Sequence, residues 1–364
     1  MSHLHLRLVI LSALFTSATA MSLRAEQFIT DTTRHKAVNF VYDARAYTYF
    51  DNLEFGSNCP YTQSQTMAGI RLSPEIGIVW GPFKLSVGAH AQKRFGTKRF
   101  IDDFDFTAYF RYREQRGRVH HDFLMGAFPR GGLIDEYHNL YFRDSINYRR
   151  PNLNGIYYNI RGRHNYLSLW LDWTGWQSST ERETFFVGLS GMQRAGRWFV
   201  AELMGYYFHY ANTTPRSGDG CVHDNAQAQL TAGIDICPGL ITSRRADDRL
   251  LLKAGLMFGY ERKRDDVTPA KTPLGLIAEL NAQIWHVGTH TIYYYGQPRQ
   301  TVETDVHTAT YWGNPLLQSK SYLQSLIYYQ LFNRQHVSAR IGWTFHLVGT
   351  KLYHQQSLHL NVNL

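Results

Sequence analysis

In FKLSVGAHAQ, residues 83–92, apolar and polar side chains alternate without a break. Phe83, Leu85 and Val87 belong to one row, whereas Lys84 and Ser86 belong to the other. Successive side chains of a β-strand point to opposite faces, so one face of this segment meets apolar surroundings and the other meets polar ones. About ten residues is also the length with which a tilted strand crosses a bilayer. The stretch therefore predicts a membrane-spanning β-strand.

Similar alternation recurs along the whole chain, at residues 104–113, 166–174, 226–236, 274–284, 337–347 and 358–364. Strands of soluble sandwiches average only about 5–6 residues. The connections also alternate, since tight turns such as 81–82 and 162–165 are separated by longer polar joins such as 51–61 and 296–320. Short turns on one side and long loops on the other are typical of outer-membrane barrels.

The sequence therefore predicts an all-β fold, a closed antiparallel transmembrane β-barrel of about sixteen strands, with short periplasmic turns and long outer loops. Fourteen strands is the alternative, because residues 185–192, 293–295 and 322–332 carry aromatic side chains on both faces. Two connections depart from the alternation of short turns and long loops. Residues 238–249 form a long connection where a short inner turn is expected, and residues 349–351 form a short one where a long outer loop is expected.

Composition agrees with a membrane wall and predicts where the protein resides. Aromatic residues make up 15% of the chain, 24 of them Tyr, which suits interfacial girdles at both edges of an apolar band. An apolar run at residues 8–15 is followed by small residues, so residues 1–25 are expected to be a secretory signal peptide. Residues 26–364 then form a single barrel domain, placed in the outer membrane of a Gram-negative bacterium.

The formal net charge of +9 raises the question of nucleic acid, but the basic residues form no stripe on a recognisable motif. The expected partners are outer-membrane lipid and small polar solutes, and the oligomeric state stays open, a trimer included. We expect neither a cofactor nor a metal. His120 and His121 are adjacent, so on a strand they point to opposite faces and cannot share an ion.

The predicted constriction site lies in the third outer loop, residues 129–154. In porins this loop folds into the lumen, where facing acids and bases select solutes by charge; a loop that only covers the mouth is the alternative. Its charged residues are Arg130, Asp135, Glu136, Arg143, Asp144, Arg149 and Arg150. Further basic residues are expected to line the pore from the wall, namely Arg45, Lys84, Arg111, Arg113, Arg161 and Arg340. Inward acids could instead pair with these cations and give a salt-bridged, partly filled interior.

An enzyme is not expected from the sequence. A lipid-facing hydrolase would need a serine and a histidine adjacent on the outer surface, and His121, the best outward histidine, has no serine beside it. The first functional hypothesis is a porin-like passive channel that favours anions. The second is a non-conducting barrel whose outer loops, for example residues 296–320 with Tyr311 and Trp312, bind a glycan, a surface or a partner protein. A barrel hydrolase is the third.

Three sequence words support a resemblance: LWLDWTG at residues 169–175, YWGNP at 311–315 and QQSLHLNVNL at 355–364. On these words the chain resembles the bacterial outer-membrane β-barrels, porin-like in form, and more narrowly the uncharacterised barrel proteins of Bacteroidetes-type bacteria. The resemblance implies location and fold and brings no activity with it. Such barrels commonly end in an aromatic residue, whereas this chain ends in Leu364.

Overall fold

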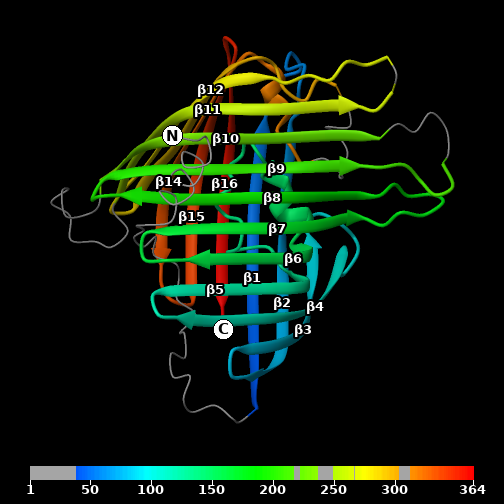
Figure 1. Cartoon of the computed structure of the whole chain (residues 1–364), viewed down its shortest axis with the longest axis vertical. Helices are drawn as coiled ribbons and strands as arrows, with labels where there is room; N and C mark the ends of the chain where they lie inside the picture. Colours follow the sequence, from blue (N-terminus) through cyan, green and yellow to red (C-terminus); the bar gives the residue numbers. More distant parts are fainter. Residues whose placement is uncertain (1–37, 217–221, 237–248, 266, 303–311) are drawn as a thin grey trace, which may run out of the picture.

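The computed structural model describes residues 38–216, 222–236, 249–265, 267–302 and 312–364. In these residues, sixteen antiparallel strands each pair with their sequence neighbours, and β16 pairs with β1 to close a barrel. In Figure 1, β7, β8 and β9 run across the view whereas β1, β2 and β16 run along its long axis. The strands are β1 (Asn39–Glu54), β2 (Gln65–Trp80), β3 (Phe83–Arg94), β4 (Asp103–Arg116), β5 (Val119–Pro129), β6 (Asn152–Arg161), β7 (Asn165–Gly175), β8 (Thr184–Ala195), β9 (Phe199–Tyr210), β10 (His223–Ile236), β11 (Arg249–Lys263), β12 (Leu274–Ile284), β13 (Val287–Gly296), β14 (Ser321–Asn333), β15 (Val337–Val348) and β16 (Lys351–Asn363).

The period-two pattern is confirmed as the pattern of the wall. On β3, Leu85 and Val87 are exposed on the outer face, whereas Ser86 and His90 are buried. The three segments of doubtful register form β8, β13 and part of β14, with a bulge between Gln330 and Phe332. The sixteen-strand prediction is therefore confirmed and the fourteen-strand alternative is wrong.

The turns explain why the hairpins at one end of the barrel are tight. Gly81, Gly117 and Gly196 have φ of +55°, +62° and +63°, a backbone region in which a glycine meets no Cβ penalty and which two-residue hairpin turns require. Gly349, in the outer connection predicted to be unusually short, has φ of +61°. The unusually long inner connection falls mostly in residues 237–248 and lies outside the described residues, as does the predicted signal peptide at residues 1–25.

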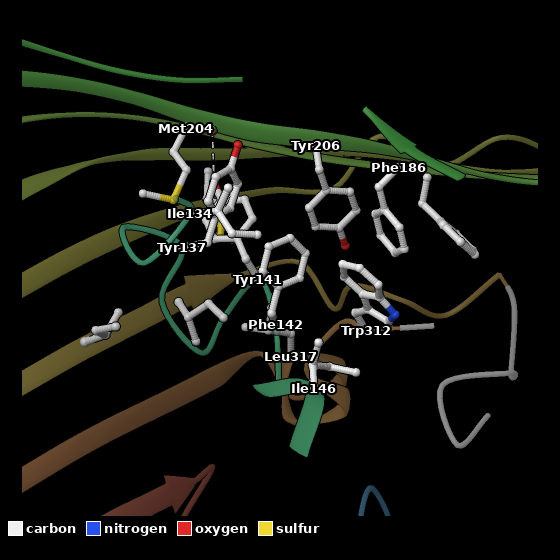
Figure 2. Packing of buried hydrophobic residues seen from close by; sticks show 14 of the residues in the cluster. Ile134, Tyr137, Tyr141, Phe142, Ile146, Phe186, Met204, Tyr206, Trp312 and Leu317 are labelled. Atoms are coloured by element: carbon white, nitrogen blue, oxygen red, sulfur yellow. Dashed lines mark hydrogen bonds between the residues drawn. The ribbon is translucent and has the colours of Figure 1, made fainter. Parts of the chain in front are cut away.

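Two outer connections of the protein enter the lumen of the barrel. Residues 130–151, which we call the lumen loop, connect β5 to β6 and contain the short helix α2 (Ser145–Arg149). Figure 2 shows Tyr141 and Phe142 of this loop pointing toward Tyr206 of the wall and Trp312 of another outer connection. The 3₁₀ helix η2 (Pro315–Gln318) follows Trp312 and is buried at Pro315, Leu316 and Leu317.

The outer surface of the wall is apolar. Its outward rows carry exposed side chains such as Leu203, Leu230, Leu252 and Leu256, which is the arrangement expected where a wall contacts hydrocarbon. Among the helices in the described residues, none is long and apolar enough to span a bilayer.

Candidate functional site

The lumen loop is tied to the wall on several sides. His138 Nε2 lies 2.9 Å from Oε1 of Gln229, and the Gln227 amide donates to the Leu140 carbonyl at 2.9 Å. The Tyr141 hydroxyl donates to the Met204 carbonyl at 3.1 Å. Of the two arrangements considered for this loop, the structure has the one in which it enters the lumen.

The charged residues of the lumen loop are held mostly by neighbours rather than by solvent. Arg130 Nη2 lies 3.2 Å from Oδ2 of Asp172, and both side chains are almost wholly buried. Glu136 accepts a hydrogen bond from the Ser190 hydroxyl. The remaining predicted residues lie as follows: Asp135 accepts from the Gly132 amide at 3.0 Å, Asp144 accepts from Asn139 at 2.9 Å and from Gln355 at 3.1 Å, the Arg143 amide donates to the Trp312 carbonyl at 2.9 Å, Arg149 is exposed, and the Arg150 carbonyl accepts from Arg130 at 2.8 Å.

Burial shifts the pKa values of two titratable groups of the lumen loop in opposite directions. It raises the pKa of Glu136 to about 7 and lowers the pKa of His138 to about 4. Burial disfavours the charged form of each group, which is why the carboxyl and the imidazole shift oppositely. Inside the lumen, therefore, His138 is neutral at physiological pH.

The predicted pore-lining cations of the wall face inward, where three pair with acids and three lie over aromatic rings. Arg45 reaches Glu75 at 2.6 Å, and Arg111 reaches Asp122 at 2.6 Å. The others pair with an acid or lie over a ring, with Arg113 3.2 Å from Asp122, Lys84 5.9 Å from the Tyr109 ring centre, Arg161 5.3 Å from that of Tyr166 and Arg340 5.2 Å from that of Tyr328. The structure brings them together with acids and aromatic rings, and their role in charge selection stays a prediction.

A cavity of about 100 Å³ lies between the lumen loop, η2 and the inner faces of β1, β2 and β16, with both polar and apolar side chains in its lining. The Gln355 amide donates there to two carboxylates, at 2.7 Å to Asp51 and 3.1 Å to Asp144. Exposed Gln63 and Gln65 line its other end, so it opens toward the outer mouth. Across the part of the chain that the structure describes, no group of three or more His, Cys, Asp or Glu is placed to hold a metal ion.

His121, the histidine singled out from the sequence, faces outward as predicted. Its Nδ1 lies 2.8 Å from the hydroxyl of Tyr158. It is the third residue of β5, directly after the tight turn at Gly117, and therefore lies at the end of the barrel opposite the long loops. An interfacial tyrosine–histidine contact explains this position.

A different outward histidine has the arrangement that acid–base chemistry requires. His209, near the end of β9, has Nδ1 2.8 Å from Oδ1 of Asp224, the second residue of β10. An Nδ1–H donated to this carboxylate leaves the lone pair on Nε2, which makes no hydrogen bond among the described residues. A base whose second nitrogen is oriented by a carboxylate is the pairing found in hydrolytic sites.

Three neighbours fix the geometry of this pair. Arg264 donates to both carboxylate oxygens of Asp224, at 2.6 Å and 3.2 Å, and the Tyr207 hydroxyl donates to Oδ1 at 2.5 Å. The ring centres of Phe185 and His209 are 5.0 Å apart. Asp224 is thus buried and accepts four hydrogen bonds from three residues, whereas His209 stays partly exposed.

The depth of the pair follows from the outward rows of the wall. On β9 the row runs from exposed Phe199 and Leu203 to Tyr207 and then His209, and long outer connections begin beyond it. Tyrosine is enriched at the interface between hydrocarbon and headgroups. His209 and Asp224 therefore lie at the boundary between the apolar band and the polar rim, on the side of the long loops.

Parity along the strands could have found this pair. Glu202 and Asp235 both face inward. The positions of His209 and Glu202 differ by an odd number, as do those of Asp224 and Asp235, so strand parity places His209 and Asp224 on the outward face. Their mutual contact depends on the β9–β10 register, in which His209 is paired with Asp224.

Comparison with known proteins identifies the family. Residues 31–364 match the model of the Lipid A 3'-O-deacylase-type family. The chain belongs to this family. The prediction that it is not an enzyme is therefore wrong, because the family description names a deacylase. No curated protein gives a significant match to the chain.

Comparison with solved structures supports the barrel architecture. OmpT of Vibrio cholerae, expressed in the outer membrane, is similar with a TM-score of 0.50 and 8% identity, over 90% of this chain and 98% of that chain. An anion-selective porin from Comamonas acidovorans has a TM-score of 0.49 and 9% identity, over 90% of this chain and 100% of that chain. At such identities the likeness concerns the fold alone. The protein is an outer-membrane β-barrel of the Gram-negative type.

Proposed function

We propose that this protein hydrolyses an acyl ester of a lipid A-type glycolipid in the outer leaflet of the outer membrane. The observation that carries the proposal is the outward-facing His209–Asp224 pair at the boundary between the apolar band and the polar rim. Acyl esters of membrane lipids lie at this depth, because their chains are in hydrocarbon and their sugars are in water. Membership in the deacylase-type family supports the same reaction class.

The roles follow from the geometry. His209 Nε2 takes a proton from a water molecule as that water attacks the ester carbonyl, and Asp224 stabilises the resulting imidazolium through Nδ1. When the tetrahedral intermediate collapses, the bond between the acyl carbon and the sugar oxygen breaks, and His209 returns the proton to that oxygen. The products are a free fatty acid and a glycolipid with one more hydroxyl group. Water as the nucleophile removes the need for the adjacent serine that the sequence argument required.

Replacing the base tests this assignment. The wild-type protein and His209→Asn would be expressed in the outer membrane of a host, and extracted lipid A would be analysed by mass spectrometry for loss of one acyl chain. We expect the variant to lose roughly 10²–10⁴-fold in rate, the usual contribution of a positioned general base. His121→Gln is the matched control, because His121 is also outward and hydrogen-bonded but lies at the other rim. Acyl release that survives His209→Asn, or a wild-type protein that releases none, would reject the proposal.

The channel predicted from the sequence is the second candidate. A barrel of about sixteen strands is wide enough for an aqueous channel when nothing fills it. The lumen loop and η2 bury many large side chains within this one, among them Leu140, Tyr141 and Leu317, so we rank hydrolysis first. Conductance in planar bilayers, with reversal potentials measured in a salt gradient, tests the channel separately.

A further inference from the structure

The outward row of β11 ends in a cation beside the candidate active site. Its members are exposed Leu252, Leu256 and Phe258, then Tyr260, and finally Arg262, which is exposed. This order is apolar, then aromatic, then charged. Arg262 therefore lies at headgroup depth, just outside the aromatic position.

The strand registers place Arg262 in line with the proposed dyad. Asp224 is paired with His209 across β9–β10 and with Arg262 across β10–β11. Residues directly opposite each other on neighbouring strands have Cβ atoms about 4.5–5.5 Å apart. His209, Asp224 and Arg262 thus form one cross-strand row on the outer surface of the wall.

The row and the neighbouring Arg264 together hold two arginines, Arg262 and Arg264, and one aspartate, Asp224. Arg264 neutralises Asp224 through its two hydrogen bonds, although its side chain remains 47% exposed. Arg262 has no side-chain partner among the described residues. Within the described residues, therefore, the Arg262 guanidinium has no acidic partner, and the half-exposed side chain of Arg264 lies two residues further along the chain.

A cluster of a different kind lies at the same rim on β1, β2 and β16. At the same rim, outward Asn52 donates to Gln356 at 2.7 Å and accepts from Thr66 at 2.6 Å, and it also donates to the carboxylate of Glu54 at 2.8 Å. Amides, a hydroxyl and an acid make up that cluster. No arginine or lysine belongs to that cluster, whereas the cross-strand row of His209 and Asp224 includes Arg262.

We infer that Arg262, together with the half-exposed Arg264, binds a phosphate group of the glycolipid headgroup and so aligns the acyl ester with His209. Guanidinium groups bind phosphate through paired, charge-assisted hydrogen bonds. Because the acyl chains of the same lipid contact the apolar row of β11, the phosphate at Arg262 and the hydrocarbon at Leu256 fix the two ends of the substrate. This inference rests on the proposed function for its catalytic consequence, but not for the binding itself.

Binding is tested first, in a form that does not need activity. Two full-length proteins would be purified in detergent, His209→Asn and the double variant that also carries Arg262→Ala. Each would be mixed with bisphosphorylated lipid A or with the same lipid after phosphatase treatment. Native mass spectrometry would then count the lipid molecules that each protein retains. We expect Arg262→Ala to reduce retention of the phosphorylated lipid roughly tenfold, as for loss of a charge-assisted contact, and to abolish the preference over the dephosphorylated lipid. Arg116→Ala is the matched control, since Arg116 is an exposed arginine already paired with Glu114 and we expect its preference to stay as in the parent.

Kinetics then separates this inference from the proposed function. With Arg262→Ala, the KM ratio between dephosphorylated and phosphorylated substrate should fall toward one, whereas loss of the base should act on kcat. Equal retention of both lipids by the parent protein would overturn the inference even if hydrolysis occurs. Displacement of the lipid by inorganic phosphate at equal concentration would assign the site to the free anion and also overturn it. Absence of hydrolysis with a preserved phosphate preference would reject only the proposed function.

Discussion

The guanidinium carbon of Arg130 lies 4.1 Å from the centre of the Trp312 ring, inside the lumen. Arg130 begins the lumen loop, whereas Trp312 belongs to the connection between β13 and β14. Two outer loops that are far apart in the sequence therefore meet in the barrel interior. Phe186 of the wall stacks on the same indole, with ring centres 4.3 Å apart.

Trp312→Ala should lower the free energy of unfolding, because it removes the contacts of Trp312 with Arg130 and Phe186. The side chain is fully buried, and truncation of a buried Trp typically costs about 3–5 kcal/mol in the free energy of unfolding. Urea unfolding in lipid vesicles, followed by fluorescence, measures the effect. Trp176→Ala is the control, because Trp176 is 77% exposed and its loss should change stability by less than about 0.5 kcal/mol. Similar values for the two variants would contradict the packing described.

Asp172→Asn should be costly because it leaves Arg130 charged and unpaired. Removing one partner of a buried ion pair typically costs about 3–5 kcal/mol, and both side chains here are at most 6% exposed. Replacing both residues with apolar ones of similar size should cost less than the single change, since no buried charge then remains. The same unfolding assay compares the single and double variants. A double variant less stable than Asp172→Asn would show that the pair itself stabilises the barrel.

Acid should loosen the lumen loop through His138. Burial lowers the pKa of His138 to about 4 in the folded protein, against about 6.5 in an unfolded chain. The unfolded state therefore binds the proton first, and the stability that neutral His138 provides is complete above about pH 6.5 and is lost as the pH falls toward 4. His138→Gln removes the titrating group, so its unfolding free energy should fall less between pH 7 and pH 4.5 than that of the wild type. Parallel pH profiles would exclude His138 as a source of the acid sensitivity.

The cost in unfolding free energy of an arginine substitution on the outward row of β11 should depend on how deep that position lies in the bilayer. Leu256→Arg places a charge within the apolar band and should cost about 2–4 kcal/mol, whereas Tyr260→Arg, nearer the rim, should cost about 0–1 kcal/mol. Both positions face outward on the same strand. Unfolding in vesicles gives the two values, and the reverse order would mean that the band is centred elsewhere.

The wall could be predicted from the sequence because its pattern is local. Period-two alternation is set by the solvent on each face, so Leu85, Val87 and their equivalents reveal the strand without any knowledge of the rest of the chain. The aromatic strands were harder. On β13, Tyr293 and Tyr295 face lipid and Tyr294 faces the packed lumen, and tyrosine suits both surroundings.

The candidate site depends on relations between strands, and this is why it was missed. Nothing local distinguishes His209 from His121, since both are outward histidines on strands with aromatic neighbours. The two histidines differ in the residue that lies across from them on the neighbouring strand. For His209 this residue is Asp224, and the pairing depends on the register of β9 and β10, which are joined by a long outer connection. Likewise, charge alone could not say that the acids of the wall would compensate Arg45 and Arg111.

The lumen loop has a consequence for biogenesis. Asp144 of this loop is hydrogen-bonded to Gln355 of β16, and Asn147 accepts from Arg71 of β2, while His138 reaches Gln229 of β10 on the far side. The loop thus links β16 and β2, which flank β1, to β10 in the middle of the chain. Seating of the loop and closure of the β1–β16 seam are therefore coupled, because a change that releases the loop removes contacts on both sides of that seam.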